Sequence, residues 1–432
     1  MECINSTKWL EELLPTDKIL LINPPVQEVR YAWIRWNQPT SLLTLSSKLK
    51  NEVGCEIEIL DFMLPNESGR VSIRDLAKQK VVNGETYKTR TYGMPVEEAS
   101  LNLRKVTQEW QPTHIVINTL TTYWFETVWT LIPYLKTLVM GCKVSLVGPY
   151  PVFETKHSLR SGADFIVTDF VDTSEYNPDF ELYFQPKSLV LNGNKKPIFG
   201  GLKFTSHNPI ENILLQIKSL KENNIRDAVI FEENLFANGA EILTGMLDNL
   251  QKQGLQMNFH ALCGLEIADA SEGIYNKMRL NGYRSFYLEY NLDGYELNLD
   301  NYRRAYSELS LLNISSGSLA GFLMIGKAED DLERLFKHSF NLLEMFGSII
   351  PKPFTPSIGS DDYKTISLSG RLDNLSPHIF PLAEKSGISR AEYMEFYQHT
   401  SFLNEKRLGN SFDFFDDQYC SVALRRSLGK KG

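Results

Sequence analysis

The chain has 432 residues, of which 42% are hydrophobic and 23% are charged, a composition typical of globular proteins with two or three domains. Its formal charge of −8 argues against nucleic acid as a partner, because phosphate binding usually needs a basic surface. No signal-peptide pattern and no apolar run near the ~20 residues of a membrane helix occurs, so we expect no membrane partner. The five cysteines are scattered and suggest no disulfide framework, which favours a reducing cytoplasm.

After an N-terminal segment of residues 1–17, strand and helix patterns alternate through a first domain of residues 18–174. The predicted strands are 18–23, 56–62, 114–120, 143–147 and 164–168, and the predicted helices are 42–49, 96–110, 124–138 and a helix that ends at 158–162. The polar stretch 70–93 is expected to be an irregular excursion loop. This alternation predicts a parallel sheet with helices on both faces, whose ligands bind at the carboxyl ends of the strands.

A second strand–helix series fills residues 205–346, after a linker of residues 175–204 that is rich in Pro, Asn, Gly and Lys. The predicted strands are 227–231, 257–262, 285–290 and 319–325, and the predicted helices are 209–223, 240–254, 271–281, 299–311 and 328–346. This regular spacing predicts a partial or full parallel barrel. Residues 347–432 lose the rhythm, apart from a helix pattern at 390–401, and are expected to form a C-terminal extension that covers the barrel mouth.

Short motifs in both halves occur in an order that is typical of one protein superfamily. They are KILLINPP at 18–25, YGMP at 92–95, TYW at 122–124, VGPYP at 147–151, RDAVIFEENLF at 226–236, NGY at 281–283, LEY at 288–290 and GFLMIG at 321–326. Over about residues 18–335 the chain resembles the cobalamin (B12)-binding-domain radical S-adenosylmethionine (SAM) proteins. The resemblance implies an α/β fold, in which a Rossmann-like cobalamin-binding-type domain precedes a partial (β/α) radical-SAM-like barrel and the C-terminal extension.

The sequence departs from this superfamily in the residues that hold its iron–sulfur cluster. The cluster needs thiolates that converge from one short CxxxCxxC loop, which is expected after the first barrel strand, near residues 189–203. That segment contains no cysteine, and the five cysteines lie apart at Cys3, Cys55, Cys142, Cys263 and Cys420. We therefore expect no 4Fe–4S cluster, and the alternative is a cluster whose cysteines gather only in the fold. The acidic Gly-Glu motif after the fifth strand is also replaced, by residues 168–172.

The resemblance places cobalamin over the carboxyl ends of the first sheet. There Asn23, Pro24 and Pro25 either hold a strand-end loop away from the sheet for a corrin ring or only terminate the strand. Tyr123 and Trp124, with Trp33 and Trp36, either form flat walls for the ligand or pack in the core. The candidate cofactor-binding residues of this domain are Asn23, Pro24, Pro25, Trp33, Thr119, Thr122, Tyr123, Trp124, Gly148 and Tyr150.

At the barrel mouth the resemblance implies contacts to SAM from Glu232, Glu233, Asn234 and Glu289, which follow predicted strands. The first three could equally cap the next helix, and without a cluster to grip its methionine end we expect little affinity for SAM. His260 and Cys263 lie near one strand end, but a zinc site needs three or four ligands, so we expect no metal there.

Two functions follow from a scaffold that keeps its motifs but lacks the cluster ligands. The first is an accessory or partner subunit, in a heterodimer with a cluster-bearing radical SAM enzyme of a biosynthetic or peptide-modification pathway. The alternative is a cobalamin-dependent enzyme that performs methyl transfer or related chemistry without a SAM-derived radical. The substrate would be a small molecule or peptide, and the sequence shows no other catalytic motif.

Overall fold

A computed structural model of the chain describes residues 1–29, 38–64, 71–74, 79–82, 85–119, 121–184, 199–204, 209–231, 235–290, 299–314, 318–369, 372 and 375–408. The predicted site residues Trp33, Glu232, Glu233 and Asn234 lie outside the described residues, as do Trp36 and Cys420. Within the described residues, no helix has both the length and the apolar character that crossing a membrane requires.

The first domain is built on a six-stranded sheet in which every pairing is parallel. Its strand order is β1 (Glu2–Ile4), β10 (Phe165–Val167), β9 (Lys143–Val147), β8 (His114–Asn118), β2 (Lys18–Asn23) and β4 (Glu56–Asp61). All five predicted strands are confirmed. The N-terminal residues 1–17, expected as a separate segment, instead supply the edge strand β1 and helix α1 (Ser6–Glu11).

Helices cover both faces of this sheet, as the alternation predicted. Residues that alternate along the strands belong to two separate hydrophobic clusters, one on each face of the sheet. On one face, Leu21 and Val116 pack with α1, α2 (Thr40–Glu52) and α7 (Phe180–Phe184). Leu20 and Ile115 pack with α3 (Val96–Trp110) and α4 (Glu126–Leu138) on the other face. Burial on both faces explains the continuous apolar runs of these strands. The loop after β9 carries α5 (Pro149–Phe153), α6 (Thr155–Ser158) and the 3₁₀ turn η2 (Leu159–Ser161).

The described parts of residues 70–93 form mainly strands, not the irregular loop that we expected. Here β5 (Ile73–Arg74) and β7 (Glu85–Tyr92) join β3 (Val26–Val29) in an antiparallel sheet, and β6 (Gln79–Val82) also pairs with β7. The strand β7 reads Glu-Thr-Tyr-Lys-Thr-Arg-Thr-Tyr, and only its second half is largely buried. A strand with so few apolar residues carries little periodic signal, so composition alone resembles that of a loop.

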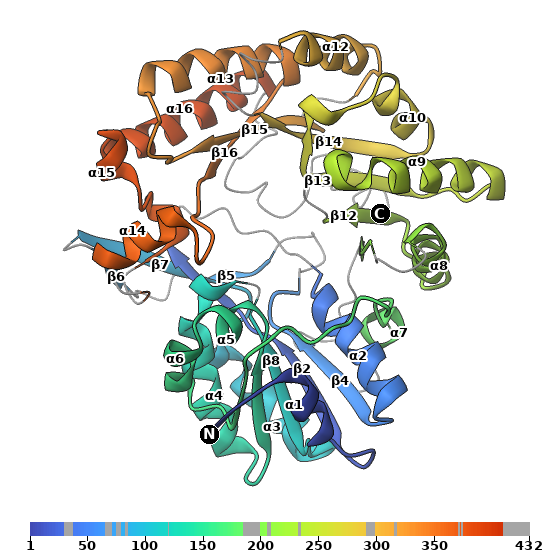
Figure 1. Ribbon diagram of the computed structural model, residues 1–432, viewed down its shortest axis with the longest axis vertical. Helices are drawn as coiled ribbons and strands as arrows, with labels where there is room; N and C mark the ends of the chain where they lie inside the picture. The colour runs from blue at the N-terminus through green and yellow to red at the C-terminus, as the bar shows by residue number, and fades with distance from the viewer. Residues whose placement is uncertain are drawn as a thin grey trace.

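The second domain contains an open, all-parallel sheet of six strands (Figure 1). Its order is β11 (Gly200–Leu202), β12 (Asp227–Ile230), β13 (Asn258–Glu266), β14 (Tyr283–Tyr290), β15 (Leu319–Ile325) and β16 (Ile349–Pro353). The helices that connect these strands are α8 (Pro209–Glu222), α9 (Leu235–Gln253), α10 (Ile274–Leu280), α12 (Leu299–Ser310) and α13 (Leu332–Phe346). The described strands therefore form a partial barrel.

The two edge strands of this sheet, β11 and β16, lie in segments where the sequence analysis predicted no strand. The expected linker, 175–204, contains α7 and the first strand β11, so the segment that follows the first strand begins at residue 203 rather than near residue 189. The expected extension from residue 347 begins with β16. Pro351 and Pro353 argued against a strand there, but β16 is an edge strand among the described residues. Proline is tolerated at an edge because no second strand there needs the N–H that proline lacks.

Carboxamide side chains pair with both edge strands of the second sheet. Gln38 donates to the carbonyl of Gly201 in β11 at 3.2 Å and accepts from its N–H at 2.9 Å. In the same way, Asn404 donates to the carbonyl of Ile349 in β16 at 2.6 Å and accepts from its N–H at 2.8 Å. Each amide therefore takes the place of a neighbouring peptide group.

The C-terminal segment joins the two domains through α14 (Asp361–Ser369), the 3₁₀ turn η5 (Pro377–Ile379), α15 (Ala383–Ser386) and α16 (Arg390–Leu408). Figure 1 shows α14 beside the antiparallel sheet and α16 beside α13 and β16. At the carboxyl end of β15, Gly326 has a φ of +93°, and a Cβ there would lie 2.9 Å from the ring of Phe380. The segment thus packs against the carboxyl end of the second sheet, and it does so too closely for a larger residue.

Candidate functional site

The carboxyl edge of the first sheet is the position where open parallel sheets bind ligands. The strand order makes β2 and β8 neighbours, although the chain visits β4 on the far side of β2 between them. The connections that leave β2 and β8 therefore diverge, which opens a crevice at their carboxyl ends. Asn23 ends β2, and Thr119 and Thr122 follow β8, so three of the predicted site residues lie at this edge.

Asn23 is held in place but keeps one acceptor without a partner. Its side chain is only 1% exposed, and its amide donates to Asp61 Oδ1 at 2.6 Å. Asp61 also accepts from the N–H of Met63 and from the hydroxyl of Tyr183, so the carboxylate that orients Asn23 is itself fixed. The Oδ1 atom of Asn23 has no hydrogen-bond partner among the described residues. A buried carbonyl oxygen without a donor is unusual and suits a ligand that donates one.

Pro24 and Pro25 separate the parallel strand β2 from the antiparallel strand β3. The carbonyl of Pro25 accepts a hydrogen bond of 2.7 Å from the hydroxyl of Thr127 in α4. The two prolines therefore lie at the change of direction between two sheets, with α4 as an anchor.

The 3₁₀ turn η1 (Thr122–Trp124) contains three predicted site residues with different environments. Thr122 is 1% exposed, and its hydroxyl has no partner among the described residues; the same holds for the indole N–H of Trp124. Tyr123 instead donates to the carbonyl of Pro356 at 2.8 Å and meets the ring of Tyr363 edge-on. Tyr123 thus binds the C-terminal segment, whereas Thr122 and Trp124 each have a polar atom without a hydrogen-bond partner among the described residues.

Gly148 and Tyr150 both lie in the loop after β9 and both have a structural explanation. Gly148 has a φ of +92° and a ψ of −164°, and a Cβ there would lie 2.0 Å from Asn118 Oδ1. Tyr150 is fully buried, and its hydroxyl is used by Trp129 at 3.0 Å and by His157 at 2.7 Å. Its backbone N–H donates weakly, at 3.4 Å, to the hydroxyl of Thr119.

A small crevice of about 70 Å³ opens between the ends of β8 and β9 and the start of α2. Asn118 lines it and donates to Ser41 at 2.9 Å, and Phe170 lines it from the segment that replaces the expected acidic motif. Phe170 and Phe153 are each about half exposed and meet edge-on at 5.7 Å. Sites for small organic ligands usually measure about 300–1,000 Å³, so this crevice alone accommodates only part of one.

The carboxyl end of the second sheet has a different, acidic character. Glu266 ends β13 opposite Glu289 in β14, and Asp269 follows in the next turn. A hydrogen bond with Asp269, partial burial and the two neighbouring carboxylates together raise the pKa of Glu266 to about 7. Gly264 permits this arrangement, since a Cβ at this residue would come within 3.3 Å of the Glu289 carboxylate. Glu289, the fourth predicted mouth residue, therefore lies in a carboxylate cluster.

The described cysteines lie in separate parts of the fold. Cys3 is in β1, Cys55 precedes β4, Cys142 precedes β9 and Cys263 is in β13. Among the described residues, no three His, Cys, Asp or Glu side chains come together as a metal site. His260 is fully buried and uses its ring nitrogens on Ser285, at 2.7 Å, and on Asp227, at 3.2 Å.

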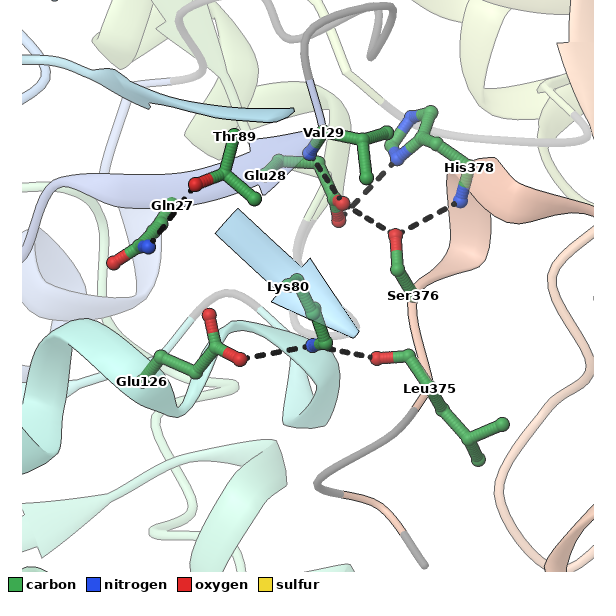
Figure 2. A network of polar contacts seen from close by, with 9 residues as sticks. All are labelled: Gln27, Glu28, Val29, Lys80, Thr89, Glu126, Leu375, Ser376 and His378. Atoms are coloured by element: carbon green, nitrogen blue, oxygen red, sulfur yellow. Dashed lines mark hydrogen bonds and ion pairs between the residues drawn. The ribbon is translucent and has the colours of Figure 1, made fainter. Parts of the chain in front are cut away.

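A buried polar network that sequence reasoning missed fastens the C-terminal segment to the antiparallel sheet (Figure 2). Glu28 in β3 is 4% exposed, accepts from the hydroxyl of Ser376 and lies 3.4 Å from Nδ1 of His378. Beside it, Lys80 donates to the carbonyl of Leu375 at 2.9 Å and pairs with Glu126 at 2.9 Å. About 350 residues separate Glu28 from Ser376, so no local pattern signals this contact.

The charges in this network set the protonation of Glu28. Burial alone would raise the pKa of its carboxyl, but His378, Lys80 and Ser376 outweigh burial and hold that pKa below its ordinary value. Glu28 is therefore an ionised, buried group that holds two segments together.

Comparison with known proteins identifies the fold. No family model matches the chain, and no curated protein matches its sequence. Its structure is similar to that of TsrM, a radical S-adenosylmethionine methyltransferase from Kitasatospora setae with cobalamin and a 4Fe–4S cluster bound. The TM-score is 0.50 at 11% sequence identity, over 82% of this chain and 78% of that one. A second TsrM structure, with tryptophan substrate and the SAM analogue aza-SAM bound, has the same TM-score and identity, over 82% and 77%.

The described residues differ in how well they could hold the two cofactors bound in TsrM, cobalamin and the 4Fe–4S cluster. Cobalamin carries amide side chains around its ring, and the unpartnered oxygens of Asn23 and Thr122 at the first edge are acceptors for such groups. A 4Fe–4S cluster does not fit the described residues, because their cysteines lie in separate elements. Residues 203–208, between β11 and α8, have the sequence Lys-Phe-Thr-Ser-His-Asn, which contains no cysteine.

Proposed function

We propose that this chain binds cobalamin at the carboxyl edge of its first sheet and acts as an accessory or partner subunit of a cluster-bearing radical SAM enzyme. The proposal rests on a contrast between the fold of the chain and its cysteines. The fold resembles a cobalamin- and cluster-containing methyltransferase over 82% of the chain, whereas the sequence has no two cysteines close enough to share a cluster loop. Without that cluster the chain cannot start a SAM-derived radical itself, so a partner would supply the radical chemistry.

Asn23 and Thr122 are the residues we propose to hold the cofactor. Asn23 is oriented by Asp61, and Thr122 lies at the start of the turn that follows β8, so both polar atoms are positioned by the sheet. They are expected to accept hydrogen bonds from the amides of the corrin rim. The exposed pair Phe153 and Phe170 adds apolar surface beside the crevice. Bound cobalamin would supply a cobalt centre capable of methyl transfer.

Purification under anaerobic conditions with hydroxocobalamin tests this proposal. We expect one cobalt per chain, a corrin spectrum in the visible range and no stoichiometric iron or sulfide. Co-purification with a radical SAM protein that carries CxxxCxxC would support the accessory role. Stoichiometric iron and sulfide would contradict it, and so would a chain that excludes hydroxocobalamin at every concentration.

Replacement of Thr122 by valine separates ligand binding from folding. The hydroxyl has no partner in the described structure, so its removal should raise the free energy of unfolding by about 1 kcal/mol, while cobalamin affinity falls several-fold. Thr127→Val is the matched control: that hydroxyl bonds the carbonyl of Pro25, so its loss should cost about 1 kcal/mol of stability. Unfolding in urea and spectral titration measure the two quantities, and unchanged cobalamin affinity in Thr122→Val would remove Thr122 from the site.

The alternative is a cobalamin-dependent enzyme that works without a radical, and one observation favours it. Glu266 has a pKa of about 7, so it can accept or release a proton near neutral pH, as a general acid or base must. This role predicts turnover by the purified, cobalt-loaded chain alone. Transfer of a methyl group from methylcobalamin to a small thiol, lost in Glu266→Gln, would favour the enzyme over the accessory subunit.

A further inference from the structure

A second cavity lies at the amino ends of the strands of the second sheet, opposite their carboxyl ends and outside the proposed cobalamin site on the first sheet. Its volume is about 740 Å³, within the range of about 300–1,000 Å³ that small-molecule sites occupy. The starts of β12, β13 and β14 and the ends of α8, α9 and α10 surround it. These helices are labelled at the right of Figure 1.

The lining of this cavity is positively charged, although the whole chain carries a charge of −8. Lys221, Arg226 and Arg284 contribute to it together with five Asn and Gln side chains, and no carboxylate does. Within the part of the chain that the structure describes, none of these three cations forms an ion pair. Uncompensated charge of one sign in a concave site attracts ligands of the other sign.

Helix ends alone do not account for these cations. In the last turn of each of the three helices a carbonyl accepts a backbone hydrogen bond instead, from Ile225 to Leu220 at 2.9 Å, from Leu255 to Leu250 at 3.0 Å and from Asn281 to Lys277 at 3.2 Å. Each helix C-terminus contributes about −0.5 of a charge, or about −1.5 in total, against the three positive side chains. A positive charge therefore remains for a ligand.

One of the arginines is held by a chain of hydrogen bonds that runs into the core. Arg284 donates to Asn258 at 3.3 Å, and Asn258 donates to Asp227 at 3.1 Å. Asp227 is 1% exposed and lies 3.2 Å from the fully buried His260. A guanidinium that is already oriented loses less conformational entropy when it binds.

We propose that this cavity binds a small polyanion of the diphosphate class. Guanidinium groups bind phosphate oxygens through two parallel hydrogen bonds, and a diphosphate carries enough charge to balance the cations that remain. Because barrel chemistry takes place at the carboxyl ends of the strands, an anion at their amino ends acts as a structural or regulatory ligand rather than as a substrate.

Calorimetric titration of the full chain with inorganic pyrophosphate, at constant ionic strength, tests the proposal. We expect saturable binding of one pyrophosphate per chain, with orthophosphate at least about tenfold weaker. Arg226→Gln and Arg284→Gln should each weaken pyrophosphate binding by about tenfold or more, and the double variant should abolish it. Arg303→Gln is the matched control, since Arg303 is exposed, as Arg226 and Arg284 are, but lies on α12 outside the cavity.

Three outcomes would overturn the proposal. They are no binding of pyrophosphate by the natural chain, equal binding of pyrophosphate and orthophosphate, and equal weakening in Arg303→Gln and in the cavity variants. Lys221→Gln provides an independent variant if an arginine replacement fails to fold, and thermal unfolding without ligand identifies such a failure. Pyrophosphate should raise the unfolding temperature of the natural chain and leave that of the double variant unchanged.

Discussion

The carboxyl ends of the two sheets occupy equivalent positions in their domains but present different chemistry. The first edge presents uncharged polar groups, the amide of Asn23 and the hydroxyl of Thr122, whose positions are fixed by neighbouring residues. The second edge presents the carboxylates Glu266, Asp269 and Glu289, where a hydrogen bond with Asp269, partial burial and the neighbouring charges raise the pKa of Glu266. The first edge therefore depends on fixed geometry and suits a neutral, amide-rich ligand, whereas the behaviour of the second depends on pH.

Replacement of Gly148 by alanine tests geometry at the first edge and should have the largest effect. The φ of +92° with ψ of −164° lies in a region that essentially only glycine adopts, and the new Cβ would lie 2.0 Å from Asn118 Oδ1. We expect a loss of about 3 kcal/mol or more in the free energy of unfolding, together with loss of cobalamin binding. Urea denaturation and spectral titration measure both.

Gly141→Ala is the control for this variant. Gly141 also has a positive φ, of +81°, but nothing lies within 4 Å of the added Cβ. Its replacement should cost about 1–2 kcal/mol, from backbone strain alone. Equal losses at the two glycines would show that the contact with Asn118 is unimportant, and the first edge would then not depend on close packing.

Replacement of Glu28 by glutamine tests whether charge also matters in the first domain, away from its edge. The change removes the ionised partner of His378 and Ser376, so we expect a loss of about 2 kcal/mol near pH 7. The lowered pKa of Glu28 stabilises the fold above pH 4.5, the ordinary pKa of the carboxyl, and that contribution disappears as pH falls through the lowered value. The free energy of unfolding of Glu28→Gln should therefore fall less than that of the natural chain as the pH is lowered below 4.5.

Glu344→Gln, at an exposed position on α13, provides the comparison for Glu28→Gln. It should change the stability by less than about 0.5 kcal/mol at any pH. Parallel stability–pH curves for the natural chain and for Glu28→Gln would contradict the ionised state of Glu28.

Replacement of Asp269 by asparagine tests charge at the second edge and should have the smallest effect on stability. Asp269 is the main cause of the raised pKa of Glu266, so that pKa should fall from about 7 toward 4.5. A raised folded-state pKa contributes stability below pH 4.5 that is lost as pH rises through 7. The free energy of unfolding of the variant should therefore fall less than that of the natural chain between pH 4.5 and 7. Carbon NMR of the glutamate carboxyls measures the titration directly.

Glu289→Gln should lower the pKa of Glu266 by less than Asp269→Asn does, because Glu289 acts on Glu266 only through its charge. The reverse order would mean that the two neighbouring strand ends, rather than the turn after β13, control this site.

The repeating parts of the fold were predictable from the sequence, because a strand buried on both faces leaves a continuous apolar run. The runs at 18–23 and 319–325 coincide with β2 and β15. Strands without such a run were missed, among them β1, which has three residues, and β7, in which threonines alternate with charged and aromatic residues.

The candidate site was predictable in position but not in the role of each residue. The rule that ligands bind at strand ends led to Asn23, Thr119 and Thr122. It could not show that Tyr150 is buried among Trp129 and His157, or that Tyr123 bonds the carbonyl of Pro356. The contact between Glu28 and His378 joins segments that are distant in sequence, and such contacts follow from tertiary packing rather than from any local pattern.

The amides of Gln38 and Asn404 have a consequence for association with other chains. Each occupies both backbone hydrogen-bonding groups of one residue in an edge strand, at Gly201 and at Ile349. An unpaired edge is a template on which a foreign strand can add, and here both templates are blocked at those residues. A strand of another chain therefore cannot bond to the backbone of Gly201 or Ile349, and loss of either amide would open these residues to edge-to-edge aggregation.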